Sequence, residues 1–246
     1  MYNIFKLLFS ILLFIAHFLY AFYLWLVNQT IYFKQLDDPW LNRSTAEDYK
    51  YSLRKTPSHL VVSVCQEEVS YDDLSKLIAW SLFLEIPIIS FYHNNNGIIP
   101  EKVFHVFKKK YQNLLPKLKW GIEFNDDIKF ESKNSINGYK WEPRIEVNVL
   151  TSKHSKLQLV NVLQNVCHSK EEFSDKLVES VIGNIYPLIE PDLVVICGDS
   201  CTTFGLLPWH TRVTEFLILK THYNVKFCKF FKLMETFSRH EQRYGK

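Results

Sequence analysis

Short apolar runs alternate with longer amphipathic segments over most of this chain, and that alternation limits the possible folds more than any other feature. "HLVVSV" (His59–Val64) and "IPIISFY" (Ile86–Tyr92) are rich in β-branched residues, as strands are. The segment between them has Ser70 followed by Asp73, a pattern typical of a helix start, and then leucine and isoleucine at helical spacing. A strand, a helix and a strand within about 35 residues form a βαβ unit, which favours a parallel sheet.

The same alternation continues to the end of the chain. Pro100 stands where a helix would begin, and "LVVIC" after Pro191-Asp192 is apolar on both sides, as a central strand of a parallel sheet must be. We expect further strands at Arg144–Leu150 and Glu215–Leu219, and further helices at His154–Cys167, Lys170–Ile182 and Phe227–Phe237. The sequence therefore predicts an α/β domain with a central, mostly parallel sheet flanked by helices.

An uncharged apolar stretch precedes this domain. Leu7–Val27 reads "LLFSILLFIAHFLYAFYLWLV", and a helix needs about 20 such residues to cross a bilayer. Aromatic residues gather at its C-terminal end, as they do at a membrane interface. We expect an N-terminal membrane anchor at residues 1–27 with one transmembrane helix over about 5–27, a polar tether at 28–57 and the α/β domain at 58–246.

Charged residues around the stretch favour one orientation. Lys6 precedes it and Lys34 and Arg43 follow it, so the positive-inside rule favours a cytosolic domain. Asn28 and Asn42 lie in Asn-x-Ser/Thr sequons, which would be glycosylated only if the domain were lumenal.

Composition excludes several classes of function. A net charge of +3 gives no support for nucleic-acid binding, and Lys108–Lys110 is interpreted as a solvated helix face. The 5 cysteines are odd in number and widely spaced, and Cys65 and Cys197 lie in apolar runs. These features favour reduced thiols over a disulfide framework.

Two loops follow strands at the edge where open α/β sheets bind ligands: "CQEEVS" and "CGDSCTTFGLLPWH". Neither has the spacing of a hydrolase nucleophile elbow or of a glycine-rich phosphate loop. Cys197 and Cys201 lack a second pair of ligands at metal spacing, so no metal site is predicted in this chain. His210 beside Trp209 is interpreted as a packed histidine.

The order of segments from His59 to Lys246 resembles the cis-prenyltransferases, the undecaprenyl and dehydrodolichyl diphosphate synthases. "LPWHTRVTE" (Leu207–Glu215) and the terminal "EQRYGK" are similar to the Nogo-B receptor family, which supplies the accessory subunit of eukaryotic dehydrodolichyl diphosphate synthase. The resemblance implies an undecaprenyl diphosphate synthase-like fold and a heterodimer or higher assembly with a catalytic cis-prenyltransferase subunit. It also implies a single-pass protein of the endoplasmic reticulum membrane.

The chain departs from the catalytic members of the resembling family. Catalytic members carry a motif similar to H-x-x-x-x-M-D-G-N-R-R at the first strand. When this motif is aligned from His59, its magnesium-binding aspartate falls at Cys65. Catalytic members also carry a motif similar to D-L-x-I-R-T-x-G-E-x-R-x-S-N-F. When this motif is aligned from Asp192, its two arginines fall at Ile196 and Thr202. The resemblance thus implies a chain that is inactive alone, has no catalytic residue in its own pocket and binds no cofactor. Mg²⁺ in the complex would be held by the partner.

In the resembling heterodimer the C-terminal Arg-x-Gly reaches into the partner's active site. Arg243, Tyr244 and Gly245 are therefore expected to bind isopentenyl diphosphate there. A guanidinium matches phosphate oxygens, and a glycine lets the backbone N–H approach closely. Residues expected at the interface or in a structural motif are Trp209, His210, Arg212, Glu215, Phe230 and Phe237.

The expected function is a non-catalytic but required subunit of the synthase that condenses isopentenyl diphosphate onto farnesyl diphosphate in cis. This reaction would feed dolichol synthesis and protein N-glycosylation. One alternative is a single-pass membrane receptor or scaffold that uses an inactive prenyltransferase fold to bind proteins. A second is a self-sufficient homodimeric synthase, against which the missing aspartate and arginines argue.

Overall fold

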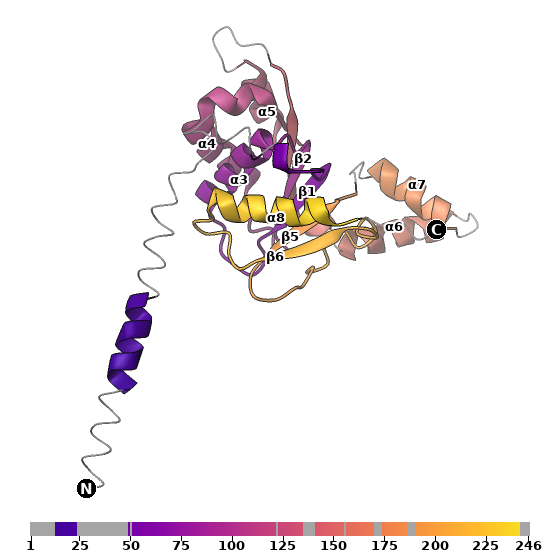
Figure 1. The fold of residues 1–246 in the computed structure, drawn as a ribbon. Helices are drawn as coiled ribbons and strands as arrows, with labels where there is room; N and C mark the ends of the chain where they lie inside the picture. The colour runs from indigo at the N-terminus through magenta and orange to yellow at the C-terminus, as the bar shows by residue number, and fades with distance from the viewer. Residues whose placement is uncertain are drawn as a thin grey trace, which may run out of the picture.

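The computed structural model describes residues 13–23, 49, 51–121, 123–134, 141–154, 156–169, 174–185 and 190–241. The elements of the body are shown in Figure 1. In chain order they are β1 (His59–Ser63), α3 (Tyr71–Phe83), β2 (Ile88–Tyr92), α4 (Pro100–Tyr111), η2 (Gln112–Lys117), β3 (Leu118–Trp120), α5 (Asp126–Asn134), β4 (Ile145–Leu150), η3 (Ser152–His154), α6 (Lys156–Ser169), α7 (Asp175–Ile185), β5 (Leu193–Cys197), β6 (Glu215–Leu219) and α8 (Phe227–Arg239).

The strands form a six-stranded sheet in the order β3-β4-β2-β1-β5-β6, and each described pairing is parallel. The prediction of a central parallel sheet is confirmed. β1 lies in the middle, with Leu60 opposite Ile89 on β2 and opposite Leu193 on β5. Because the strands are parallel, the carboxyl ends of β1, β2 and β5 lie at one edge of the sheet.

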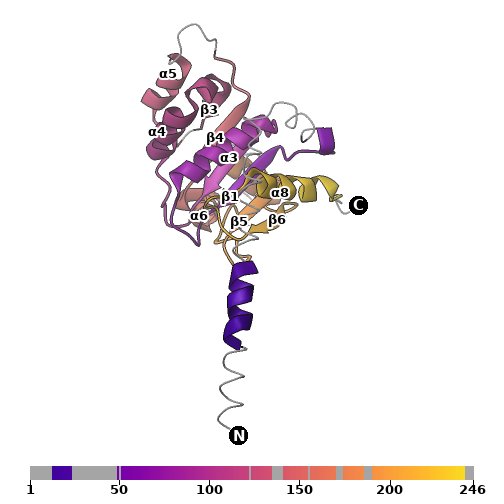
Figure 2. The ribbon, with the colours of Figure 1, turned by 60° about the vertical axis from the view of Figure 1, so that its left-hand side comes forward.

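Alternate residues of the central strands point to opposite faces of the sheet. Leu60 and Val62 belong to the larger core, which α3, α4 and α8 cover. Val61 belongs to a smaller core on the other face, together with Leu206 and Leu207. Figure 2 shows α3 and α8 lying across the strands.

Helix α8 has the amphipathic pattern expected from its sequence. Phe227, Phe230, Phe231, Met234 and Phe237 are all buried in the larger core. Phe230 and Phe237, for which an interface or a structural role was expected, are 1% and 2% exposed. Their rings pack inside this chain's own core, so their role is structural and they leave no surface for a partner.

The packed body begins earlier than the sequence indicated. The Tyr49 ring lies 5.4 Å from Phe227 and 4.8 Å from Phe231, measured between ring centroids. The Lys55 ammonium lies 4.5 Å from the centroid of the Phe237 ring. The last part of the stretch expected as a polar tether (28–57) therefore packs against α8.

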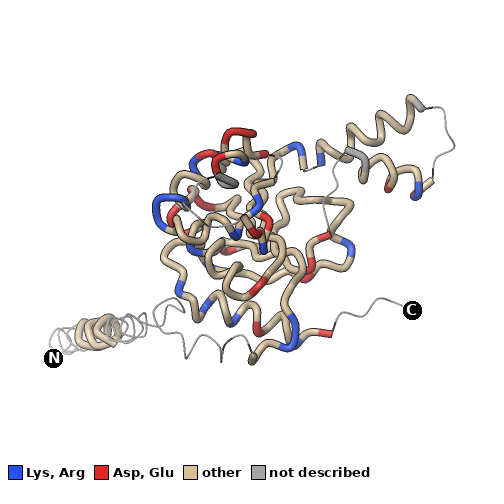
Figure 3. Tube along the Cα trace, turned by 90° about the horizontal axis from the view of Figure 1, so that it is seen from above, with Lys and Arg blue, Asp and Glu red and all other residues tan. Residues whose placement is uncertain are grey.

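Residues 13–23 form a helix whose side chains are exposed, and Figure 3 shows it without a charged residue. Among the described residues, no helix combines the length and the apolar character that crossing a membrane requires. The predicted span over about residues 5–27 extends beyond the described residues at both ends and stays a prediction. Asn28 and Asn42 also lie outside them.

Candidate functional site

The candidate site is the carboxyl edge of the sheet around β1 and β5. From β1 the chain continues to β2 on one side, and the later strand β5 pairs with β1 on the other side. In open α/β sheets such a switch in strand order opens the crevice where ligands bind. Residues 64–70 follow β1 and residues 198–210 follow β5, so both loops quoted from the sequence meet here.

Cys65 lies in the loop just after β1 and is half-buried. Its sulfur accepts the Asn94 backbone N–H at 3.2 Å and lies 3.5 Å from the Ser63 hydroxyl. Burial raises the pKa of this thiol, and the hydrogen bonds from Ser63 and Asn94 only partly offset that effect. The sulfur is therefore a protonated thiol at neutral pH. Magnesium prefers hard oxygen ligands, so Cys65 does not suit it.

The Gln66 side chain occupies the space between the two loops. Its Nε2 donates to the Ser200 carbonyl at 2.7 Å, and its Oε1 accepts the Ser200 N–H at 3.3 Å. Gly198 makes room for it with φ 135°, since a Cβ there would lie 2.4 Å from Gln66 Cδ. The protein's own amide group thus fills this part of the edge.

The remaining groups at this edge do not fit a diphosphate or a magnesium ion. Ile196 is fully buried and Thr202 is exposed. Residues 59–75 and 190–211 contain no lysine or arginine to pair with phosphate oxygens. In the described part of the chain, no group of three or more His, Cys, Asp or Glu side chains could hold a metal.

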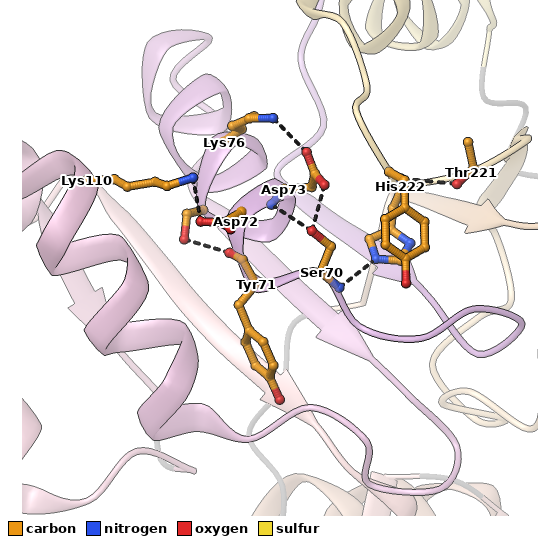
Figure 4. A network of polar contacts seen from close by, with 10 residues as sticks. Ser70, Tyr71, Asp72, Asp73, Lys76, Lys110, Thr221 and His222 are labelled. Carbon is orange, nitrogen blue, oxygen red and sulfur yellow. Dashed lines mark hydrogen bonds and ion pairs between the residues drawn. The ribbon is translucent and has the colours of Figure 1, made fainter.

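The Glu67 carboxylate contacts the loop before α8. Its Oε2 accepts the His222 backbone N–H at 2.9 Å and lies 2.5 Å from His222 Nδ1. The Ser70 N–H donates to Nε2 of the same ring at 3.0 Å, as Figure 4 shows. Because Nε2 accepts a hydrogen bond, Nδ1 of this fully buried ring carries a proton and donates it to Glu67.

The Glu67 carboxylate is stabilised by these bonds. Burial alone would raise its pKa, but hydrogen bonds from Thr221 and from the backbone and ring of His222 outweigh burial. The pKa of Glu67 therefore lies below its ordinary value.

Ser70 begins α3, as its spacing to Asp73 predicted. The Ser70 hydroxyl lies 2.6 Å from Asp73 Oδ2, and the Asp73 N–H donates back to it at 3.4 Å. Lys76 pairs with the same carboxylate at 2.7 Å. Burial would raise the pKa of Asp73, but its hydrogen bonds with Lys76 and Ser70 hold it below its ordinary value. The cap fixes where the β1–α3 loop ends.

Trp209 and Arg212 connect the β5–β6 loop to α7, and His210 lies between them in the chain. Trp209 packs against the valine cluster between α6 and α7, and burial lowers the pKa of His210, which is 7% exposed. Arg212 pairs with Glu179 at 3.0 Å and with Glu190 at 2.7 Å. Their contacts within the chain are structural.

Glu215 pairs with His240 just beyond α8, with 2.8 Å between Oε2 and Nδ1. Arg243, Tyr244 and Gly245 lie outside the described residues, so their role stays a prediction.

Sequence reasoning did not identify the contacts of Gln66, Glu67 or His222. The printed order of residues contains no signal for the Glu67–His222 pair, since 155 positions separate the partners.

The fold is that of the cis-prenyltransferase-like proteins. Two solved structures are similar: a probable undecaprenyl diphosphate synthase from Campylobacter jejuni (TM-score 0.53, 16% identity, 78% of this chain and 100% of that chain) and lavandulyl diphosphate synthase from Lavandula x intermedia (TM-score 0.56, 11% identity, 78% and 99%). At these identities the likeness concerns the fold alone.

Curated homologues of this chain are dehydrodolichyl diphosphate synthase complex subunits named NUS1. The human protein is 27% identical over 210 residues, covering 79% of this chain and 69% of its own length. The mouse protein is 28% identical over 211 residues (79% and 68%), and that of Saccharomyces cerevisiae is 27% identical over 132 residues (51% and 35%). No protein-family model matches the chain. The predicted resemblance to the accessory subunits is confirmed.

Proposed function

We propose that this chain is a non-catalytic but required subunit of a heteromeric dehydrodolichyl diphosphate synthase. With a catalytic partner it would condense isopentenyl diphosphate units onto farnesyl diphosphate in cis, for dolichol synthesis and protein N-glycosylation. The names of the homologous subunits support membership in such a complex.

One observation carries the non-catalytic part of the proposal: the chain's own side chains fill the carboxyl edge of its sheet. Gln66 bridges to Ser200, Cys65 is a protonated thiol, and Glu67 is bonded to His222. No cation from either loop is available to hold a diphosphate. A transferred diphosphate needs such positive charge, because its oxygens carry the developing negative charge.

In this proposal the C-terminal segment of the chain helps to bind substrate in the partner's active site. Arg243 would donate to a phosphate of isopentenyl diphosphate in the partner's site, Gly245 would offer its backbone N–H, and Tyr244 would space the two. Mg²⁺ would be bound by the partner. The N-terminal helix would anchor the chain in the endoplasmic reticulum membrane with the α/β domain in the cytosol.

Co-expression with a catalytic cis-prenyltransferase subunit tests this proposal. Prenyl transfer from farnesyl diphosphate should be high for the purified pair and absent for this chain alone. The partner alone should show much lower turnover than the pair. Measurable turnover by this chain alone would disprove a non-catalytic subunit, and a partner with full activity alone would disprove a required one.

A further inference from the structure

The buried Glu67–His222 pair resembles an acid–base pair, but its geometry excludes that role in this state. Nδ1 faces Glu67 Oε2 and Nε2 accepts the Ser70 N–H. Both ring nitrogens are therefore occupied, and the fully buried ring has no free atom to present to a ligand. The pair must serve a different purpose.

Further bonds join the same two loops. The Tyr223 hydroxyl donates to the Glu68 carbonyl at 2.7 Å, and the Asn224 backbone N–H donates to the Asp73 carboxylate. The rings of His222 and Tyr223 lie 4.4 Å apart. The consecutive residues His222–Asn224 are thus bonded to Glu67 and Glu68 in the loop after β1 and to Asp73 in the first turn of α3. The loop that contains His222–Asn224 leads directly into Phe227, the first residue of α8.

The far end of α8 is also held. The Glu215–His240 pair fixes the residue directly after the helix, and Phe237 is buried close by. The C-terminal segment, residues 242–246, follows Glu241. A shift or tilt of α8 would therefore move the point from which that segment leaves the body.

We propose that Glu67 and His222 are a positioning pair: the β1–α3 loop, which has lost the residues for chemistry, anchors α8 and thereby sets where the C-terminal segment begins. The inference rests on the proposed function, because the role of that segment in a partner's site is itself proposed. Displacing a catalytic contact by about 1 Å can cost on the order of a hundredfold in rate. An anchor far from the chemistry can therefore affect turnover strongly.

The chain offers matched variants. Glu67→Ala leaves the buried N–H groups of His222 without an acceptor, whereas Glu67→Gln keeps an oxygen that accepts from both. Glu68→Ala is the control, because its exposed carboxylate makes no hydrogen bond or ion pair among the described residues. Tyr223→Phe removes one hydroxyl at a 39% exposed surface position, so it loosens the same contact without threatening the fold.

These variants are compared in the full complex by kcat/KM, by the fraction assembled and by hydrogen exchange over residues 227–241. Glu67→Ala should lower kcat/KM of the assembled complex at least tenfold and speed exchange in α8. Tyr223→Phe should show a smaller change in the same direction. Glu67→Gln and Glu68→Ala should stay within about twofold of the original protein. A purely structural role predicts less assembled complex but unchanged kcat/KM per complex, and that result would overturn the inference.

Combining Glu67→Ala with Arg243→His decides whether the pair acts through the C-terminal segment. If it does, the double variant should lose little more activity than Arg243→His alone, because the same contact is already gone. If the fold-losses in kcat/KM of the two single variants multiply in the double variant, the inference is overturned. If Arg243→His alone has no effect, the proposed function fails, and α8 exchange still tests the anchor: unchanged exchange in Glu67→Ala would refute it.

Discussion

At the scale of single residues, this protein keeps a ligand-binding edge in shape but fills it with its own polar groups. Gln66 and Ser200 satisfy each other across the crevice, and Gly198 provides the space for that contact. Cys65 is the position at which the resemblance places a metal-binding aspartate of catalytic relatives. Its sulfur contacts the Ser63 hydroxyl, the Tyr92 carbonyl and the Asn94 backbone N–H.

Cys65→Ala should therefore leave the turnover of the complex nearly unchanged. The substitution removes a protonated thiol and leaves the Asn94 N–H without its acceptor, which affects stability slightly. Steady-state kinetics of the assembled complex are the measurement. A tenfold loss, about 1.4 kcal/mol of activation free energy, would show that this edge takes part in the reaction.

His154 gives the free energy of unfolding a dependence on pH. Burial lowers its pKa to about 4, and its Nδ1 accepts the Thr151 N–H, a bond that protonation would break. The unfolded chain binds this proton near pH 6.5, so stability is full above that pH and falls as pH drops toward 4. The slope from this residue should be about 1.4 kcal/mol per pH unit. Urea unfolding at several pH values should show a shallower slope in His154→Gln, and an identical slope would contradict the assignment.

At the scale of elements, α8 connects the larger core to the C-terminal end of the described chain. Its aromatic face completes the larger core. The loop after β1 holds the segment before α8, and Glu215, the first residue of β6, holds the residue after it. The spacing of its phenylalanines predicted an amphipathic helix, but spacing alone does not tell whether the apolar face meets the same chain or another one. The structure shows that it meets the same chain.

Phe230→Ala should destabilise the body by about 3–5 kcal/mol, because a fully buried ring is removed from a packed core. Cys228→Ala on the exposed face of the same helix is the control and should change stability by less than about 0.5 kcal/mol. Urea denaturation of both variants measures the difference. Equal, small effects would mean that α8 does not pack as described.

At the scale of the whole molecule, the body is a scaffold that holds two ends in place. Tyr49 packs on α8 near the N-terminal end of the body, and His240 is tied to Glu215 near the C-terminal end. Both contacts involve α8 or the residue after it. In the proposed function, this chain contributes to a complex through the segment that follows Glu241.

Arg243→His tests that contribution directly. A charge-assisted hydrogen bond to a phosphate is worth about 1.5–3 kcal/mol, so kcat/KM for isopentenyl diphosphate should fall by about ten- to a hundredfold or more. Gly245→Ala should also reduce activity, through backbone strain and a lost close approach. Tyr244→Leu should be mild, and all three complexes should remain assembled. Unchanged kinetics in Arg243→His would show that the segment is only solvated.

Much of the fold followed from local patterns. The strands β1, β2, β4, β5 and β6 lie where β-branched runs predicted them, within about two residues at each end. β3 was missed because it has only three residues, with an exposed lysine between Leu118 and Trp120. α5 was missed because "DDIKFESKN" has few apolar residues to show a helical period.

The sequence by itself determined the parallel α/β architecture, the amphipathic α8 and the absence of lysine and arginine from residues 59–75 and 190–211, because periodicity and side-chain chemistry are properties of neighbouring residues. Only the tertiary structure decided that Glu67 bonds to His222, that Gln66 bridges to Ser200 and that Phe230 and Phe237 face the chain's own core. These contacts join residues far apart in the sequence, such as the 155 positions between Glu67 and His222. The parallel sheet brings them together because it gathers the ends of β1, β5 and β6 at one edge.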